Sequence, residues 1–336
     1  TAGVLVSLDV NTGEVLAMAN LPSYNPNNRK QLTVDALRNR AVTDQFEPGS
    51  TLKPFTVAAA LESGKFNVHS HFNTSPGTYK VLNKLIRDHE NYGVIDMPTL
   101  LTKSSNVASA QIAMALPRDT LPLLHRRLGF GHRTGSGFPG ESAGSMQPSN
   151  RWNPVEIATM SYGYGVTVTA LQLAQAYAVI ASGGIQRPIS FTKVTGPVPG
   201  KRILDEKIAR AIIPMMETVV TQEGTALRAA VPGYRIAGKT GTAHKAQGGG
   251  YASDAYMSLF VGMAPASAPR VVTAIIIDNP RQGGYYGGLA AAPVFSRMMS
   301  DTLRLMNIEP DRSAERLAEQ HRFPHPSTWA RPGREG

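Results

Sequence analysis

The sequence predicts an α/β (α+β) fold in which strands from both ends of the chain share one sheet and helices occupy the middle. Near the N-terminus, two apolar-rich runs at residues 4–9 and 14–18 flank the turn-forming tripeptide Asn11-Thr12-Gly13, which predicts a hairpin. Three more apolar and β-branched runs predict strands over residues 235–240, 256–264 and 270–278. Strands at both ends with helices between them indicate that the ends of the domain meet in one sheet.

The residues between these strands follow a mostly helical pattern. The run from Thr51 to Leu61 is apolar on nearly every side, which is typical of a buried helix, and Ser63-Gly64 is expected to end it. Further helices are predicted over residues 106–116, 120–128, 154–161, 169–182, 205–221 and 291–305. A stretch rich in Gly, Ser and Pro, from Gly129 to Trp152, is expected to form a loop.

The size and composition of the chain favour one globular domain. A chain of 336 residues, 42% of them apolar and 17% charged, can bury a core without a metal or a disulfide. We expect a domain over residues 1–307, with a helical subdomain inserted over about residues 65–230, and a tail over residues 308–336. Cysteine is absent, which excludes thiol catalysis and fits an exported bacterial protein. The histidines lack metal-ligand spacing, so no metal site is expected.

The charge balance is basic, with 34 Lys and Arg residues against 24 Asp and Glu residues and a net charge of +10. This balance suits an acidic partner such as nucleic acid, anionic lipid or cell-wall polymer, or is simply a solvated basic surface. No run of five basic residues occurs and no aromatics alternate with basic residues, so nucleic acid is not an expected partner. The longest apolar runs, such as residues 271–277, fall far short of the roughly 20 residues of a membrane span. Residue 1 is not Met, and we expect an excised piece whose anchor lay upstream.

Ser50 and Lys53 form a Ser-x-x-Lys pair at the start of the predicted buried helix. At this spacing the two side chains lie on one helix face within hydrogen-bond reach, so an amine with a depressed pKa can take the hydroxyl proton and make Ser50 a nucleophile. Ordinary usage of Ser and Lys predicts about one chance match in a chain of this length. A second copy, Ser190 to Lys193, lies in a strand-like stretch, where residues three apart point to opposite faces. Only Ser50 has a suitable setting.

Three further groups of residues are candidates. Ser104-Ser105-Asn106 precedes a predicted helix, where Ser and Asn are also the ordinary N-cap residues. Lys239-Thr240-Gly241-Thr242 ends a strand and offers charge, hydroxyl donors and close backbone approach, although alone it is equally a strand end with an exposed lysine. Tyr285 and Tyr286 follow the last strand between glycines, either as a surface turn or as a wall for an apolar substrate group.

Three of these motifs, taken together and in this order, are the signature set of penicillin-binding proteins and serine β-lactamases. They are Ser50-x-x-Lys53, Ser104-x-Asn106 and Lys239-Thr240-Gly241. The match extends to residues 18–28, 46–50, 86–88, 137–141, 162–165 and 238–243. Over about residues 1–307 the chain resembles a class B penicillin-binding protein of the division-septum (FtsI-like) type. The resemblance implies a penicillin-binding transpeptidase or serine β-lactamase-like fold, in which an antiparallel sheet is flanked by helices and carries an inserted, mostly helical subdomain.

The resemblance also implies a role for each motif residue. Ser50 would be the acylated nucleophile and Lys53 its base, Ser104 would relay protons, and Lys239 would add positive potential. The oxyanion hole would consist of the backbone N–H groups of Ser50 and Thr242. Substrate would be bound by Asn106, Thr240, Gly241 and Thr242, and Tyr285 and Tyr286 are the candidate wall beside it. One position departs from the family, because His244 stands where members often have Arg, which weakens the case for a second fixed cation.

The implied function is that of a peptidoglycan D,D-transpeptidase without a cofactor, whose serine is acylated by D-Ala-D-Ala stem peptides and is blocked by β-lactam antibiotics. A serine β-lactamase, a D,D-carboxypeptidase and a β-lactam sensor domain are the alternatives. The chain lacks the Glu-x-x-Leu-Asn run of class A lactamases, and Asn106 stands where class D enzymes usually have Val. The resemblance further implies a place at the bacterial inner membrane with the catalytic domain facing the periplasm, and membrane-anchored cell-wall synthesis partners such as a glycosyltransferase.

Overall fold

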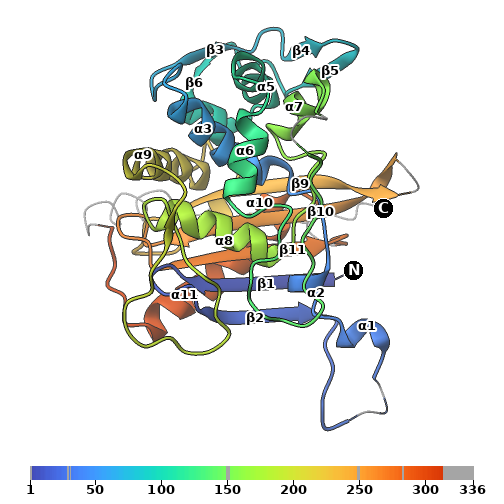
Figure 1. Cartoon of the computed structure of the whole chain (residues 1–336), viewed down its shortest axis with the longest axis vertical. Coiled ribbons are helices and arrows are strands. Elements are labelled where there is room, and N and C mark those ends of the chain that lie inside the picture. The colour runs from blue at the N-terminus through green and yellow to red at the C-terminus, as the bar shows by residue number, and fades with distance from the viewer. Residues whose placement is uncertain are drawn as a thin grey trace, which may run out of the picture.

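The computed structural model describes residues 2–28, 30, 32–148, 152–247, 250–281 and 284–312. At its centre is a five-stranded antiparallel sheet with the strand order β2-β1-β11-β10-β9 (Figure 1). Its strands are β1 (Ala2–Asp9), β2 (Val15–Leu21), β9 (Ala237–Gln247), β10 (Gly250–Ala264) and β11 (Val271–Asp278). Because β1 pairs with β11, strands from the first and last parts of the domain meet in one sheet, as the sequence predicts. Strand β9 lies at the edge.

The turn between β1 and β2 shows why this hairpin forms. The Asp9 carboxylate accepts the backbone N–H groups of Asn11 at 2.7 Å and Thr12 at 2.9 Å. Gly13 adopts a φ of 77°, and a side chain there would overlap the Pro188 carbonyl. The tripeptide recognised in the sequence therefore reverses the chain and also lets a distant segment approach closely.

Helices pack against this sheet. Helix α8 (Ala170–Ala181) crosses the near face in Figure 1, and its capping box pairs Thr169 with Gln172. Helix α11 (Ala292–Leu305) packs through Phe295, whose ring meets that of Phe260 edge-on at 4.8 Å. The first six residues of β11 are buried, as expected for a central strand covered on both faces.

The remaining elements fall into two groups. Those in the helical part at the top of Figure 1 are α3 (Lys53–Glu62), α4 (Met97–Lys103), α5 (Asn106–Ala115), α6 (Thr120–Arg127), α7 (Pro154–Met160), β3 (His71–Asn73), β4 (Thr78–Val81), β5 (Lys84–Arg87) and β6 (Val94–Asp96). The others are α1 (Val34–Leu37), α2 (Arg40–Thr43), β7 (Ile185–Gln186), β8 (Lys201–Arg202), α9 (Glu206–Glu217) and α10 (Gly287–Ala290). One buried apolar cluster runs through both the sheet and the helical part.

Several expectations need correction. The predicted helix from Thr51 begins as a 3₁₀ turn over Gly49–Leu52, and α-helical geometry starts only at Lys53. Helix α4 and the small ribbons β3–β6 and β4–β5 were not predicted. The first residues of the expected tail belong with the domain, because Asp311 accepts the Arg235 N–H at 2.7 Å and Arg312 donates to Gly233. Residues 313–336 lie outside the described residues.

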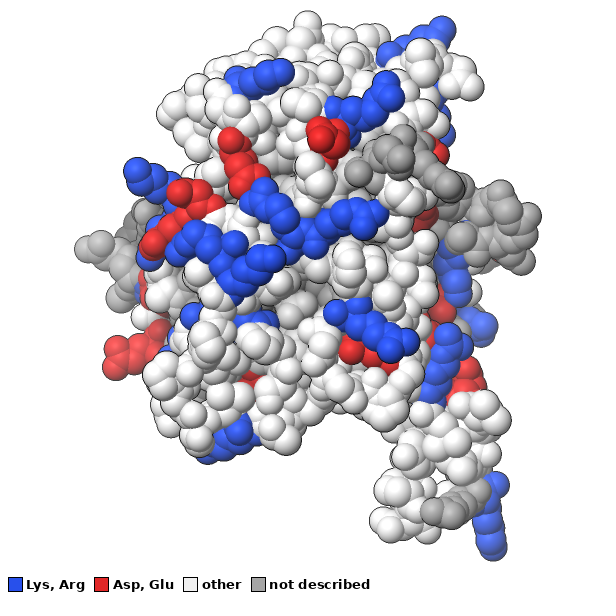
Figure 2. Space-filling view, in the orientation of Figure 1, with Lys and Arg blue, Asp and Glu red and all other residues white. Residues whose placement is uncertain are grey.

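The basic charge gathers visibly on the face shown. Figure 2 shows Lys and Arg side chains in a band across this face, over the end of α6 and the neighbouring part of α8. The last turn of α6 carries Arg126 and Arg127, and the exposed strand β8 consists of Lys201 and Arg202. This side of the molecule is therefore basic. Within the described residues, no helix has the length and apolarity to cross a membrane.

Candidate active site

The turn that carries Ser50 is held in place by two glycine contacts. Gly49 has a φ of 54°, and its N–H donates to the Gly163 carbonyl at 3.1 Å. A side chain at Gly163 would overlap the Gly49 backbone, so the loop after α7 lies directly against the turn. Ser50 itself is half buried, and the helix that follows is buried from Lys53 to Ala60. The candidate nucleophile thus lies, half buried, in the turn that leads into a buried helix.

The Lys53 amine points to the start of α5 and not to Ser50. Its Nζ donates to the Ser104 carbonyl, to Ser104 Oγ at 3.1 Å and to Asn106 Oδ1 at 2.8 Å. In its charged form the amine has three protons, one for each of these contacts. No hydrogen bond joins the Ser50 hydroxyl to any described residue, which corrects the expectation that it bonds to the Lys53 amine. The hydrogen bond between these two residues is a backbone one, from the Lys53 N–H to the Ser50 carbonyl. Catalytic hydrogen bonds are often long or poorly aligned in a free enzyme and tighten only when substrate binds.

Ser104 lies between two buried lysine amines. The Lys239 Nζ donates to Ser104 Oγ at 2.9 Å and lies 3.4 Å from Thr240 Oγ1. Ser104 ends α4 in the left-handed region, with a φ of 59°, which is uncommon for a residue with a side chain. This backbone conformation turns the hydroxyl toward both lysines, and such strain is concentrated at functional sites.

The two lysines are electrostatically unusual because both are completely buried. Burial lowers the pKa of Lys53 well below its ordinary value, the nearby charge of Lys239 lowers it further, and Asp88 partly offsets both effects. Burial also lowers the pKa of Lys239, to about 7. Two ammonium groups sharing one hydroxyl repel each other, so the pair carries less than two full charges at neutral pH. An uncharged amine is therefore available to accept a proton.

Strand β9 lies tightly against the Ser50 turn. A side chain at Gly241 would come within 2.9 Å of the Pro48 carbonyl and of Thr51 Cγ2. The hydroxyls of Thr240 and Thr225 are 2.7 Å apart, and Thr242 Oγ1 accepts the Gly287 N–H at 3.1 Å. Glycine is thus required at position 241 for the strand to reach the turn.

The free edge of β9 presents backbone donors. Burial and Glu47 raise the pKa of Tyr164, and a backbone hydrogen bond from His244 partly lowers it, so the His244 N–H donates to this phenol. Because Tyr164 lies in the loop after α7 and not on β10, that N–H points away from β10. Alternate residues of an antiparallel strand point their N–H groups the same way. The Thr242 N–H therefore also points outward, on the side of the Ser50 turn.

A row of aromatic rings borders β9. Tyr256 and Tyr285 stack with centroids 4.1 Å apart, and Tyr285 and Tyr286 are 4.5 Å apart. Tyr286 also meets His89, which follows β5, at 6.1 Å. Tyr285 and Tyr286 are 37% and 43% exposed. Because the Gly287 N–H is hydrogen-bonded to the Thr242 hydroxyl, the row of rings lies beside β9. Through the contact of Tyr286 with His89, it also reaches the helical part.

The structure thus brings Lys53, Ser104, Asn106 and Lys239 into hydrogen-bond contact, with Ser50 one turn before Lys53. The second Ser-x-x-Lys copy is not part of this cluster. Ser190 donates to the Thr192 carbonyl at 2.7 Å. Sequence reasoning assigned no role to His89, Tyr164 and Tyr256. The segment at residues 162–165 was part of the family resemblance, and this was the one available signal for Tyr164.

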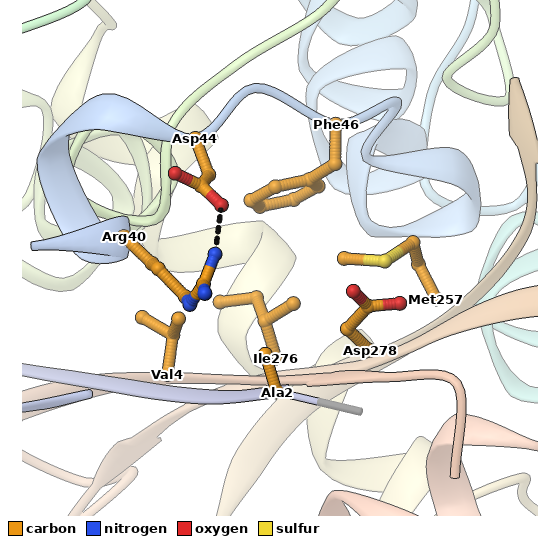
Figure 3. Close-up of a pocket in the computed structure, with 8 residues that line it drawn as sticks. All are labelled: Ala2, Val4, Arg40, Asp44, Phe46, Met257, Ile276 and Asp278. Atoms are coloured by element: carbon orange, nitrogen blue, oxygen red, sulfur yellow. Dashed lines mark hydrogen bonds and ion pairs between the residues drawn. The ribbon is translucent and has the colours of Figure 1, made fainter. Parts of the chain in front are cut away.

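Two cavities lie away from the cluster. One, of about 30 Å³, lies between α2 and the ends of β1 and β11, where Arg40 pairs with Asp44 at 3.1 Å (Figure 3). It has room for about two water molecules. The other, of about 600 Å³, is lined in part by Arg187, Arg210 and Arg235. Neither includes a motif residue. The described residues contain no group of three or more side chains suited to hold a metal ion.

Comparisons with known proteins show which family the chain matches. Residues 3–300 match the family model described as penicillin binding protein transpeptidase domain. The chain is 47% identical over 310 residues to the peptidoglycan D,D-transpeptidase FtsI of Escherichia coli K12, covering 92% of this chain and 52% of that protein. It is 42% identical over 309 residues to the probable peptidoglycan D,D-transpeptidase PenA of Neisseria meningitidis, covering 92% of this chain and 53% of that protein. The chain therefore spans about half the length of these curated relatives.

A solved structure is also similar. It is the apo structure of the TP domain from Burkholderia pseudomallei penicillin-binding protein 3, which aligns with a TM-score of 0.86 and 39% identity. The alignment covers 93% of this chain and 91% of that one. This likeness confirms the predicted fold class, an antiparallel sheet flanked by helices in the penicillin-binding, serine β-lactamase-like arrangement.

Proposed function

Because the chain belongs to the family of penicillin-binding protein transpeptidase domains, in its FtsI-like class B branch, we propose that it is a peptidoglycan D,D-transpeptidase of the division type. The observation that carries this proposal is the contact of Ser104 Oγ with two buried lysine amines, one of which, Lys53, follows Ser50 by one turn. Acyl transfer requires a nucleophile, a base that is uncharged near neutral pH and a route for the proton to the leaving group. This cluster supplies all three.

Acylation proceeds as follows in this proposal. The Ser50 Oγ attacks the carbonyl carbon of the penultimate D-Ala, and its proton passes to the uncharged Lys53 amine. The backbone N–H groups of Ser50 and Thr242 bind the oxyanion that develops on the carbonyl oxygen, each contributing roughly 3–4 kcal/mol. As the peptide C–N bond breaks, a proton passes through the Ser104 hydroxyl to the departing D-Ala nitrogen. The ester on Ser50 is then transferred to an amine acceptor.

Substrate binding uses the remaining motif residues. The terminal carboxylate of the donor lies against the Thr240 and Thr242 hydroxyls and the positive potential of Lys239, and Gly241 leaves room for the peptide backbone beside the edge strand. Asn106 donates one Nδ2 proton to the Arg87 carbonyl at 3.0 Å, so its second Nδ2 proton serves the substrate amide. Tyr285 and Tyr286 form an apolar wall.

The proposal includes the wider setting of the protein. Its substrates are peptidoglycan stem peptides, and β-lactams acylate the same serine. We propose a location at the bacterial inner membrane with the catalytic domain facing the periplasm, and membrane-anchored cell-wall synthesis partners such as a glycosyltransferase. These points rest on the family relationship and on the names of the relatives.

The distinguishing experiment compares transfer with hydrolysis. A small D-Ala thioester donor is mixed with the protein and increasing amounts of a D-amino acid, and the products are separated by chromatography. We expect a transfer product that rises with amine concentration. In a parallel reaction with benzylpenicillin, intact-mass spectrometry should show an adduct that persists from many minutes to hours. Hydrolysed penicillin accumulating while the adduct disappears within seconds would identify a β-lactamase and overturn the proposal.

A further inference from the structure

Asp88 lies just after β5 and faces the first turn of α5. One carboxylate oxygen, Oδ1, accepts the Asn106 N–H at 2.5 Å and the Val107 N–H at 3.0 Å, and Oδ2 accepts the Ser105 hydroxyl at 2.6 Å. Ser105 is itself the N-cap of α5 and accepts the Ala108 N–H at 3.0 Å. Together, Ser105 and Asp88 therefore satisfy the first three backbone donors of this helix.

The corner held by Asp88 carries two candidate site residues. Ser104 ends α4 and Asn106 begins α5, so they flank Ser105 directly. The segment containing Asp88 is anchored separately, because Asp88 N–H donates to the Gly77 carbonyl at 3.0 Å and the preceding Arg87 carbonyl accepts Asn106 Nδ2. Asp88 thus joins the β4–β5 ribbon to the residues that bind the Lys53 amine, without contacting that amine by a hydrogen bond.

We propose that Asp88 is a positioning residue for acyl transfer, which holds Ser104 and Asn106 where they bind the Lys53 amine and places a negative charge near that amine. This inference rests on the proposed function only in assigning acylation to Ser50. Asp88 acts through the α4–α5 corner and through its charge, and it does not touch the reacting atoms.

The charges around Lys53 give this role a measurable signature. The groups that act on its amine are Lys239 from β9, which disfavours its charge, and Asp88, which favours it. Tyr92 lies near Asp88 and Glu90, but burial and these two carboxylates raise the pKa of this phenol to about 12, so it stays neutral. Removing the charge of Asp88 should therefore lower the pKa of Lys53 further and extend the supply of uncharged amine to lower pH.

The test uses two substitutions and a matched control. Asp88→Asn keeps an oxygen for the backbone of α5 but removes the charge, whereas Asp88→Ala removes both. Asp96→Asn is the control, because Asp96 caps the neighbouring helix α4 by accepting the Thr99 N–H at 2.9 Å. The rate of Ser50 acylation by a fluorescent penicillin is measured from pH 5 to 9 for each protein, and thermal unfolding is followed in parallel.

The expected result separates charge from position. For Asp88→Asn, the plateau rate should fall only a few-fold while the acid limb of the profile moves to lower pH. For Asp88→Ala, the plateau rate should fall at least about tenfold. Asp96→Asn should alter neither the plateau nor the limb. If Asp88→Ala does not fold, the profile of Asp88→Asn decides alone.

Other outcomes would overturn the inference. A wild-type profile in the Asp88 variants would remove the positioning role, and an equal loss in Asp96→Asn would reduce the effect to ordinary helix capping. Acylation is common to a transpeptidase and a hydrolase, so this test does not depend on the fate of the acyl-enzyme. Absence of wild-type acylation at Ser50 would instead contradict the proposed function.

Discussion

Lys53 and Lys239 donate to the same oxygen atom, Ser104 Oγ, at 3.1 and 2.9 Å, although both side chains are completely buried. Two full positive charges at such a distance in a poorly solvated site repel strongly. The pair therefore titrates as a coupled unit, and loss of a proton from either amine relieves the repulsion. This relationship makes a lysine usable as a base near neutral pH.

The role of Lys53 can be tested by Lys53→Arg. A guanidinium keeps the positive charge but does not release its proton at any working pH, so the variant lacks a base. We expect penicillin acylation to slow by about 10²- to 10⁴-fold, the usual contribution of general acid–base catalysis. Stopped-flow labelling measures the rate, and Lys193→Arg in the second Ser-x-x-Lys copy is the control. A Lys53→Arg rate within a few-fold of wild type would exclude the base role.

Ser50 and Ser190 provide a matched pair for identifying the nucleophile. Ser50→Ala should abolish covalent labelling by a fluorescent penicillin, while Ser190→Ala should label as wild type does. Stability should change by no more than about 1 kcal/mol for Ser50→Ala, because the hydroxyl has no hydrogen-bond partner among the described residues and its removal strands no other group. Gel fluorescence and denaturant unfolding measure the two effects. Labelling that survives in Ser50→Ala but is lost in Ser190→Ala would reverse the assignment.

His125 makes the fold sensitive to acid. It is completely buried, neither ring nitrogen has a hydrogen-bond partner among the described residues, and burial lowers its pKa from 6.5 to about 4. The unfolded chain therefore binds a proton near pH 6.5 that the folded protein binds only near pH 4. Stability is highest above about pH 6.5 and falls as the pH drops toward 4, by roughly 3 kcal/mol in all.

Urea unfolding at pH 7 and pH 5 measures this effect. Replacing His125 by Phe removes the titrating group and keeps an aromatic ring beside Phe130, which it now meets at 5.7 Å. The loss of unfolding free energy between the two pH values should shrink by roughly 2 kcal/mol in this variant. His69→Phe is the control, because His69 is exposed. An unchanged pH dependence in His125→Phe would show that other groups cause the acid sensitivity.

Local patterns were sufficient to predict the frame of the fold. The β1–β2 hairpin, helices α5 to α9 and α11, and strands β10 and β11 follow from apolar periodicity and from turn or capping residues that act within a few positions. The β3–β6 and β4–β5 ribbons were missed because strands of three or four residues carry almost no periodicity. Helix α4 had one usable signal, Asp96 followed by Met97-Pro98, which is an N-cap before a proline in the first turn.

The candidate site depends on contacts that no local pattern contains. Ser104-x-Asn106 and Lys239-Thr240-Gly241 each have an ordinary structural explanation, and they become informative only as an ordered set that resembles a family. The left-handed backbone of Ser104 and the direction of the Lys53 amine follow from packing between elements that are distant in sequence. For the same reason, Tyr164 gains significance only when its loop is seen against β9.

Gly163 offers a test of how closely the site depends on the loop after α7. It has a φ of 90°, and a Cβ there would overlap the Gly49 carbonyl, immediately before Ser50. Gly163→Ala should therefore push the loop and the Ser50 turn apart. Gly140→Ala is a matched control, because Gly140 has a similar φ of 77° but its Cβ would meet no atom within 4 Å. The control isolates the backbone strain, which costs about 1–2 kcal/mol.

Acylation rates and unfolding free energies should separate the two glycine variants. Gly140→Ala should lose about 1–2 kcal/mol of stability and acylate at the wild-type rate. Gly163→Ala should lose more stability and acylate at least about tenfold more slowly, because the Ser50 turn, with its hydroxyl and N–H, is displaced relative to the Thr242 N–H, the other oxyanion donor. If both variants lose stability equally and acylate equally fast, the turn tolerates the displacement, and the Gly163–Gly49 contact does not position Ser50. If only Gly163→Ala is slowed, the contact between the two backbones sets the place of the nucleophile.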